Sequence, residues 1–221
     1  MTSRGERTRR RILDEAELLY GARGVDGVSL REIRIAAGQR NTSAMQFHFG
    51  GADGLVRALG ERHMPAVGAL QEHLRAELTP SDGRAGPEAL VEIMVRPWAD
   101  YVTRGPGARS WVRIAAELAA RPERLWLEFR DHSPTVMVEV GAELLDHLAT
   151  RLGPRLALDR MTKVNLATLH LCADRARIED AARSSEMKVL AHDDWASDLV
   201  DMAVAAMLAA SRLTTPQPSH G

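Results

Sequence analysis

The 221-residue chain contains one cysteine, Cys172, and few aromatic residues, which make up 4% of it. A single cysteine excludes an intramolecular disulfide and any site built from several cysteines, and it is typical of a reducing cytoplasm. No run of about 20 apolar residues occurs, so no membrane-spanning helix is expected. The basic residues 1–11 lack the apolar segment of a secretory signal. These absences predict a soluble, cytoplasmic protein.

Sequence motifs of enzymes are also missing. The chain has no glycine-rich phosphate loop, no H-E-x-x-H, no paired-cysteine motif and no G-x-S-x-G. We therefore expect neither catalysis nor a bound cofactor or metal. The composition, 45% hydrophobic and 27% charged with few β-branched runs, favours a globular all-α fold.

Lysine is nearly absent, since only Lys163 and Lys188 occur. Residues 1–64 hold 11 arginines against 8 acidic residues, a net charge of +3. The rest of the chain holds 18 basic and 22 acidic residues, a net charge of −4. The two parts add up to the overall net charge of −1. A basic N-terminal part on an acidic body is the polarity expected when that end alone meets a polyanion. Its contacts with nucleic acid would then depend on arginine.

Two helices are predicted near the N-terminus. The first covers about residues 7–22, because apolar residues from Ile12 to Tyr20 recur at i, i+1, i+4, i+7 and i+8, and Gly24 ends it. A second helix begins after Ser29, which forms the S-x-x-E spacing of a capping box with Glu32. Val28 and Ile33 have the spacing of a hydrophobic staple. The residues expected to face inward are Leu30, Ile33 and Ala36, and Gly38 ends the helix.

A third short helix is predicted over about residues 42–48, capped by Asn41 or Thr42. We expect Ala44 and Phe47 to face inward. Two short helices joined by a glycine-containing turn are the helix-turn-helix pattern, in which the start of the second helix meets base edges in the major groove. The candidate DNA-binding residues in and before this helix are Arg40, Asn41, Thr42, Ser43, Met45, Gln46 and His48. Among them, His48 is more typical of a packing and orienting group than of a base reader.

The rest of the chain is expected to be helical. One long helix, kinked near Pro65, should follow Gly50-Gly51 and end before the Pro- and Gly-rich loop 79–87. Further helices are predicted over about 87–104, 108–120, 133–151, 157–183 and 193–212, and residues 214–221 are expected to be disordered. A mainly apolar ligand cavity is one interpretation of the middle helices and ordinary core packing is the other. The candidate ligand residues are Met94, Trp98, Tyr101, Trp111, Ile114, Phe129, Met137 and His170, although a core role is the simpler interpretation of His170.

The segment from Thr8 to Leu59 resembles the Tet repressor (TetR) family of bacterial regulators. The resemblance is carried by an ordered set: Thr8, Arg11, Ile12, Leu13, Ala16, Tyr20, Gly24, the run 28–33, Ala36-Ala37-Gly38, Phe47-His48-Phe49 and Leu55. Two features depart from the family pattern. Gly51-Ala52 replace a Ser-Lys pair whose lysine grips a phosphate, and the stretch from Gly38 to Phe49 is one residue longer than usual.

The resemblance implies a homodimeric repressor with a near-palindromic operator, released from DNA by a small, mainly apolar effector. It implies a DNA-binding head (residues 1–52), a ligand-binding and dimerisation body (53–213) and a tail (214–221). Within the head, Arg31 matches a family position on the second helix that approaches DNA, which makes it a further candidate DNA-binding residue. Dimerisation would use residues 157–183 and 193–212. The last of these helices carries a stripe of apolar and small residues that suits close helix packing: Trp195, Leu199, Met202, Ala203, Ala206, Met207 and Ala210. This stripe either contacts the partner subunit or faces the core of its own subunit.

Two alternatives to a regulator remain open. A helical adaptor that binds protein but never DNA would agree with Gly51-Ala52 and with the overall negative charge. The other alternative is an enzyme. His192 beside Asp193-Asp194 could suggest a metal site for it, but acidic residues after a loop are more typical of the first turn of a helix.

Overall fold

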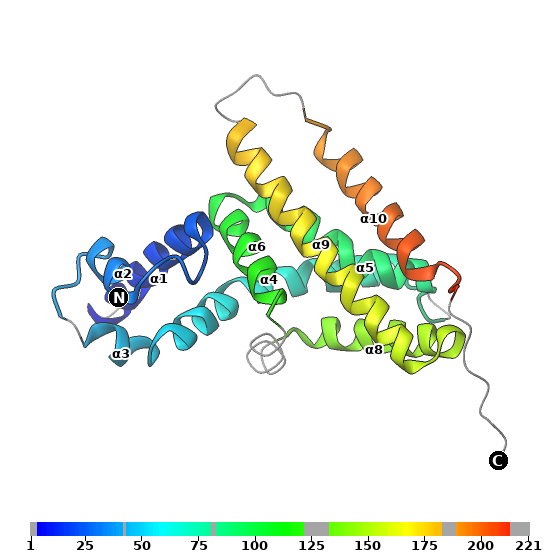
Figure 1. The fold of residues 1–221 in the computed structure, drawn as a ribbon, viewed down its shortest axis with the longest axis horizontal. Helices are drawn as coiled ribbons and strands as arrows, with labels where there is room; N and C mark the ends of the chain where they lie inside the picture. Colours follow the sequence, from blue (N-terminus) through cyan, green and yellow to red (C-terminus); the bar gives the residue numbers. More distant parts are fainter. Residues whose placement is uncertain (1–3, 42, 81–82, 122–132, 183–188, 213–221) are drawn as a thin grey trace, which may run out of the picture.

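The computed structural model describes residues 4–41, 43–80, 83–121, 133–182 and 189–212. Over these residues it contains nine α-helices and one 3-10 turn and no strand, which confirms the predicted all-α class (Figure 1). None of these helices is both long and apolar enough to cross a membrane. Three predictions concern residues outside these ranges: the ligand-binding role of Phe129, the DNA-binding role of Thr42 and the disorder of the tail.

Three helices form the head at one end of the molecule (Figure 1). In the apolar stripe predicted for the first of them, Ile12, Leu13, Ala16 and Tyr20 are buried and Leu19 is partly buried. Gly24 ends that helix with a φ of +80°, a left-handed conformation that glycine adopts at no steric cost. The bounds are α1 (Arg4–Arg23), α2 (Leu30–Ala36) and α3 (Ala44–Phe49).

The predicted capping box of α2 is present. The Ser29 hydroxyl accepts a hydrogen bond from the Glu32 backbone N–H, and the Ser29 N–H donates to Glu32 Oε2 at 2.8 Å. Ile33 is buried as expected. The prediction that Ala36 faces inward is wrong: Ala36 is exposed and Ala37, one position later, is buried. One helical step of about 100° separates the two positions, so the inward face continues at i+4 from Ile33.

The orientation predicted for α3 is right for Ala44, which is buried, and wrong for Phe47. Met45 is buried with 4% of its surface exposed, whereas Phe47 is 83% exposed. The helix begins at Ala44 rather than at residue 42, and its inward face is set by Met45 and Phe49, which lie four residues apart. Phe47 lies midway between these two in sequence and therefore on the opposite side of the helix.

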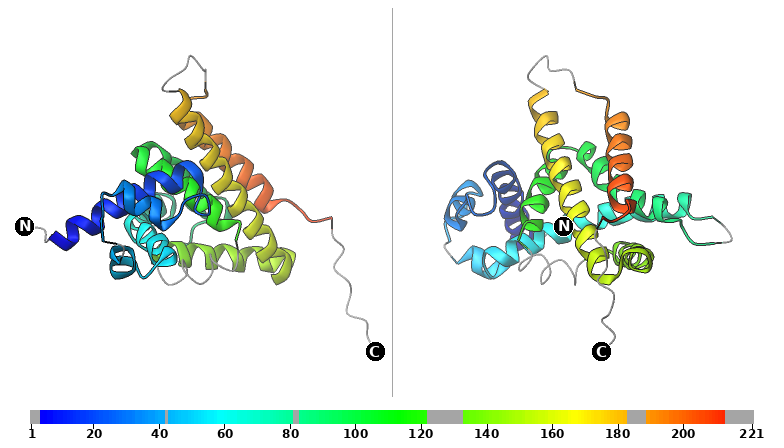
Figure 2. Two further views of the ribbon diagram at one scale, coloured as in Figure 1. Left: turned by 60° about the vertical axis from the view of Figure 1, so that its left-hand side comes forward. Right: turned by 45° about the vertical axis from the view of Figure 1, so that its right-hand side comes forward.

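The predicted long connecting helix is confirmed as α4 (Ala52–Leu78), which runs from the head into the body with Pro65 inside it. The loop expected after it separates α4 from α5. The body contains α5 (Pro87–Tyr101), the 3-10 turn η1 (Val102–Arg104), α6 (Pro106–Ala119), α8 (Thr135–Leu152), α9 (Pro154–Ala182) and α10 (His192–Leu208). Helix α9 packs on α6 and α8, and α10 packs on α5 and α9 (Figure 2).

Candidate nucleic-acid interface

The outward face of α3 carries three side chains. Ser43, Gln46 and Phe47 follow one another at i, i+3 and i+4 and are all exposed. The Gln46 amide has both donors and an acceptor for the edge of adenine, and the Phe47 ring offers an apolar surface for a thymine methyl group. Of the sequence predictions, Ser43 and Gln46 lie on this face, and Phe47 was missed.

Met45, which was also predicted to contact DNA, is instead part of the head core. This corrects the prediction that its methyl group touches a base. His48 is half-buried beside the exposed ring, and the Phe47 and His48 ring centroids are 5.0 Å apart in an edge-to-face arrangement. That placement suits a residue that orients Phe47.

The turn between α2 and α3 is fixed by hydrogen bonds to its backbone. Arg34 Nη1 donates to the carbonyls of Gln39 at 2.6 Å and Arg40 at 3.3 Å. At the other end of the turn, Asn41 Oδ1 accepts from the Ser43 backbone N–H at 2.9 Å. The Asn41 side chain thus serves the turn, and Arg34 is a structural residue that the sequence analysis did not single out.

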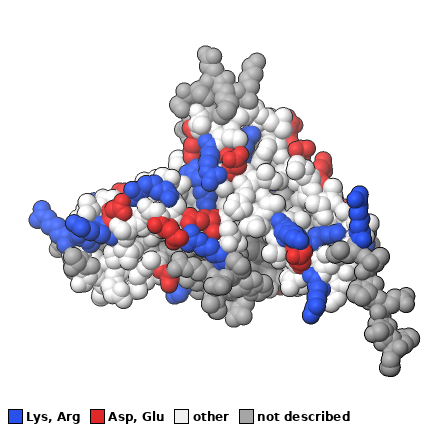
Figure 3. Space-filling model, in the orientation of Figure 1, with Lys and Arg blue, Asp and Glu red and all other residues white. Residues whose placement is uncertain are grey.

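Two exposed arginines flank α3: Arg31 lies on α2, and Arg40 lies in the turn. In the face drawn in Figure 3, basic side chains gather at the end of the molecule that α1–α3 form. Guanidinium groups bind phosphate oxygens or a guanine edge through paired hydrogen bonds. The position and chemistry of both arginines therefore suit contacts with the DNA backbone or with bases beside α3.

The start of α4 lies directly after α3. Gly50 and Gly51 have φ values of +70° and +122°, which glycine adopts without strain. The N-cap of α4 is Gly51, which has no side chain to cap the first amides, and Asp53 lies in the first turn. The amide end of a helix attracts a phosphate, whereas the carboxylate of Asp53 opposes it.

The capping box also has an electrostatic role. The pKa of Glu32 is lowered to about 2 by hydrogen bonds from the Ser29 backbone and hydroxyl and from Arg23. Glu32 therefore remains ionised well below neutral pH. Arg23, whose guanidinium lies 2.9 Å from Glu32 Oε1, ties the end of α1 to the beginning of α2.

The predicted ligand residues lie in different environments. Met94, Tyr101, Trp111 and Ile114 are buried, Trp98 and Met137 are half-buried, and His170 is exposed on α9. The core interpretation of His170 is therefore wrong. Tyr101 and Trp111 come together around His63, with ring centroids 6.0 and 5.4 Å from that of the histidine.

An open groove of about 400 Å³ lies elsewhere in the body, between α4 and α8. None of the predicted ligand residues that the structure describes lines this groove. Arg75 crosses the groove and pairs with Glu139 at 2.6 Å and Glu143 at 2.5 Å on α8. Its lining consists of Glu72, Arg75, Ala76, Thr79, Thr135, Val136 and Glu139.

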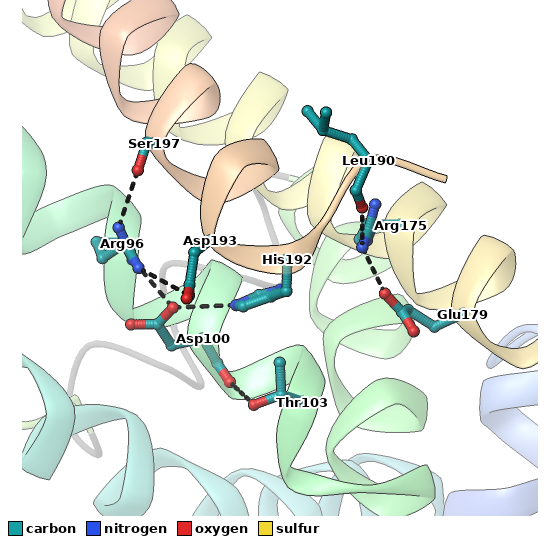
Figure 4. Close-up of polar contacts among 9 residues, drawn as sticks. All are labelled: Arg96, Asp100, Thr103, Arg175, Glu179, Leu190, His192, Asp193 and Ser197. Carbon is teal, nitrogen blue, oxygen red and sulfur yellow. Dashed lines mark hydrogen bonds and ion pairs between the residues drawn. The ribbon is translucent and has the colours of Figure 1, made fainter. Parts of the chain in front are cut away.

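The start of α10 is held by polar contacts with α5 (Figure 4). Arg96 Nη2 lies 3.4 Å from Asp193 Oδ1, and His192 Nε2 lies 3.1 Å from Asp100 Oδ1. Asp193 and Asp194 occupy the first turn of α10, as predicted, where the helix dipole stabilises their negative charge. Through these contacts, His192 and Asp193 anchor the start of α10 on α5.

The apolar stripe predicted on the last helix is divided between two faces. Leu199, Ala203 and Met207 are buried within the chain itself, which matches the interpretation of the stripe as core. Met202 is 55% exposed, and Ala206 and Ala210 are also exposed. Trp195 is half-buried against the Arg175 guanidinium, 5.3 Å from its ring centroid.

No family model matches the chain, and no curated protein matches it by sequence. Among solved structures, a bacterial regulatory protein of the TetR family from Rhodococcus RHA1 aligns with 95% of this chain and 100% of its own, with a TM-score of 0.54 and 18% identity. A protein assigned to the TetR family of transcriptional regulators, from Mesorhizobium loti, aligns with 94% of this chain and 98% of its own, with a TM-score of 0.51 and 17% identity. The chain has the fold of TetR-family transcriptional regulators, as the resemblance of its first 59 residues predicted.

Proposed function

We propose that this chain is a TetR-family transcriptional regulator, without enzymatic activity, that binds a near-palindromic operator as a homodimer. The observation that carries the proposal is the outward face of α3, where Ser43, Gln46 and Phe47 are exposed together at the basic end of the molecule. A capped α2 and a hydrogen-bonded turn hold this face in place. We expect repression, because a bound dimer blocks access to the DNA that it covers.

Selection from a pool of random DNA duplexes tests this function. The expected product is a near-palindrome whose half-sites lie about one helical turn, roughly 10 base pairs, apart. Binding should weaken steeply with added salt, because arginine contacts displace counterions from phosphates. Failure to enrich any palindrome at low salt would contradict the proposal and favour a protein-binding adaptor.

Arg31→Ala and Gln46→Ala are each expected to weaken operator binding by about 1–3 kcal/mol. Both side chains are exposed, so the midpoint of thermal unfolding should not change. Fluorescence anisotropy with the selected operator measures the affinity, and Arg84→Ala, an exposed arginine in the loop before α5, is the matched control. If Arg31→Ala and Gln46→Ala both left the affinity for the operator unchanged, the outward face of α3 and its flank would not be the DNA-binding surface.

The proposed dimer uses α9 and α10. Support comes from the apolar side chains that these helices leave exposed, Leu158 and Leu171 on α9 and Met202 on α10. Such side chains gain free energy when a partner covers them. Sedimentation analysis checks the state of association: the mass of two chains is expected, and a single chain at micromolar concentration would contradict it.

The proposed effector is a small, mainly apolar molecule that binds within the body and releases the DNA. The support is the apolar and aromatic character of the middle helices, including Met94, Trp98 and Met137. Repeating the duplex selection in the presence of a panel of small molecules tests this part of the proposal. A compound that lowers the recovery of the operator identifies the effector class.

A further inference from the structure

A buried hydrogen-bond chain joins the head to the body. Glu17, on α1, is 8% exposed, and its Oε2 lies 2.8 Å from His63 Nε2 on α4. His63 Nδ1 lies 2.7 Å from the hydroxyl oxygen of Tyr101 at the end of α5. Arg62 Nη1 donates to the same Glu17 oxygen at 3.0 Å and pairs with Asp14 at 2.8 Å. One carboxylate of the head thus binds α4 directly and is linked to α5 through His63.

The direction of these hydrogen bonds follows from the groups themselves. Burial raises the pKa of Glu17, but hydrogen bonds from His63 and Arg62 and their positive charge outweigh burial and bring the pKa below its usual value. Burial, followed by the charge of Glu17, raises the pKa of Tyr101 to about 12, so its hydroxyl keeps its proton. An ionised Glu17 accepts hydrogen bonds from His63 Nε2 and Arg62 Nη1, and the protonated Tyr101 hydroxyl shares a hydrogen bond with His63 Nδ1.

Glu17 also reaches a third body helix. A side chain at Gly107, in the first turn of α6, would place its Cβ only 2.3 Å from Glu17 Oε1. The carboxylate therefore lies against the amide end of α6, where the helix dipole favours a negative charge. Trp111, one turn further along α6, stacks on the His63 ring with an angle of 7° between the planes. Glu17 is thus surrounded by α4, α5 and α6.

The contact between α1 and α6 continues beyond this cluster. Gly21 approaches Ser110, the Val25 N–H donates to Glu117 Oε2 at 2.8 Å, and Asp26 pairs with Arg121 at 2.7 Å. The paired residues follow the same order in both segments, from Gly21 with Ser110 to Asp26 with Arg121. We call this row of contacts the α1–α6 seam.

The other side of α6 is tied to α9. Asp180 on α9 binds Arg109 Nε at 2.6 Å and Arg113 Nη1 at 2.7 Å. Burial raises the pKa of Asp180, but the two arginines outweigh burial and lower it, so the pair is ionised at neutral pH. Helix α6 therefore links the head to the helix that the proposed dimer would use.

We propose that Glu17 is a positioning residue, whose carboxylate joins α1 of the head to α4, α5 and α6 and so sets the direction in which the body presents α3. The inference about DNA affinity rests on the proposed function, but the inference about head orientation does not. Glu17 acts through His63 and the seam and has no contact with DNA in this role. Removing its charge should loosen the head without unfolding it.

A distance measurement tests the orientation without DNA. Spin labels are placed on introduced cysteines at Ala36 in α2 and Ala142 in α8, both exposed positions, and labelled protein is diluted with unlabelled protein. Burial, with a smaller effect of Asp100, raises the pKa of the Cys172 thiol, and this cysteine has no exposed surface, so it should not take up label. We expect one narrow distance in the unaltered protein and in Glu15→Gln, a matched control on α1. Glu17→Gln and Tyr101→Phe should broaden or shift the distance.

Operator affinity, measured on unlabelled protein, provides the second result. Glu17→Gln and Tyr101→Phe are each expected to weaken binding about tenfold, the size of effect expected when one hydrogen bond of the chain through His63 is weakened or lost. The double variant should have the same affinity as the single variant that binds less tightly, because both substitutions break the same hydrogen-bond chain through His63. Tyr101→Phe removes one hydroxyl from the body, so it keeps the test decisive if Glu17→Gln fails to fold.

The outcomes separate the two proposals. An unchanged distance in Glu17→Gln and Tyr101→Phe, additive losses in the double variant, or a broadened distance with undiminished operator affinity would each overturn the positioning role. A broadened distance in a protein that selects no operator would support the positioning of the head while rejecting the proposed function.

Discussion

Trp111→Ala is expected to lower the free energy of unfolding by about 3–5 kcal/mol, the usual effect of removing a large aromatic side chain from a core. Trp111 has no exposed surface and lies in α6, with its ring stacked on that of His63 at a centroid distance of 5.4 Å. The truncation removes apolar area and leaves a cavity between the head and the body. Urea unfolding followed by circular dichroism measures the loss.

Trp98→Ala is the matched control for this prediction. The same side chain is deleted there, but Trp98 is only half-buried on α5, so less apolar surface is lost and solvent can fill part of the space. We expect roughly half the effect of Trp111→Ala. Equal losses in the two variants would show that Trp111 has no special place in the core.

The local parts of the head could be predicted from the sequence because their signals lie within a few residues. The capping box needs Ser29 and Glu32 only three positions apart, and the stripe of α1 repeats over two turns. Both are present in the structure. The long α4 was predicted for the same reason, since its apolar residues recur about every four positions.

The inward face of α3 could not be assigned correctly from so short a helix. Six residues make fewer than two turns, and the pattern fits two faces: Ala44 with Phe47 at i, i+3, or Met45 with Phe49 at i, i+4. The first pairing, used in the prediction, omits Phe49, which is buried. Including Phe49 in the helix would have selected the second pairing and exposed Phe47.

The Glu17 cluster could not be predicted because its members lie far apart along the chain. Glu17, His63 and Tyr101 come from three helices, and their contact depends on how those helices cross. One local signal was available: Glu17 stands four residues after Leu13 and three before Tyr20, inside the apolar stripe of α1. A carboxylate in such a position requires a buried partner.

Gly21→Ala is expected to destabilise the protein by about 1–3 kcal/mol, although alanine favours a helix more than glycine does. The new Cβ would lie 2.6 Å from Ser110 Cβ and Oγ and 2.8 Å from Ser110 Cα. A rotation of the serine side chain does not move its Cα, so α1 must shift away from α6. Because α1 carries the reading face with it, operator affinity should fall as well.

Gly141→Ala provides the opposite control. Gly141 lies inside α8, and a Cβ added there would meet nothing within 4 Å. The same substitution should therefore stabilise the protein by about 0.5–1 kcal/mol, the difference in helix propensity, and leave operator affinity unchanged. Urea unfolding of both variants isolates the effect of the α1–α6 seam, since the chemical change is identical. If Gly21→Ala were as stabilising as Gly141→Ala, the close approach of α1 and α6 would not exist in solution, and α6 would not hold the head in a fixed orientation.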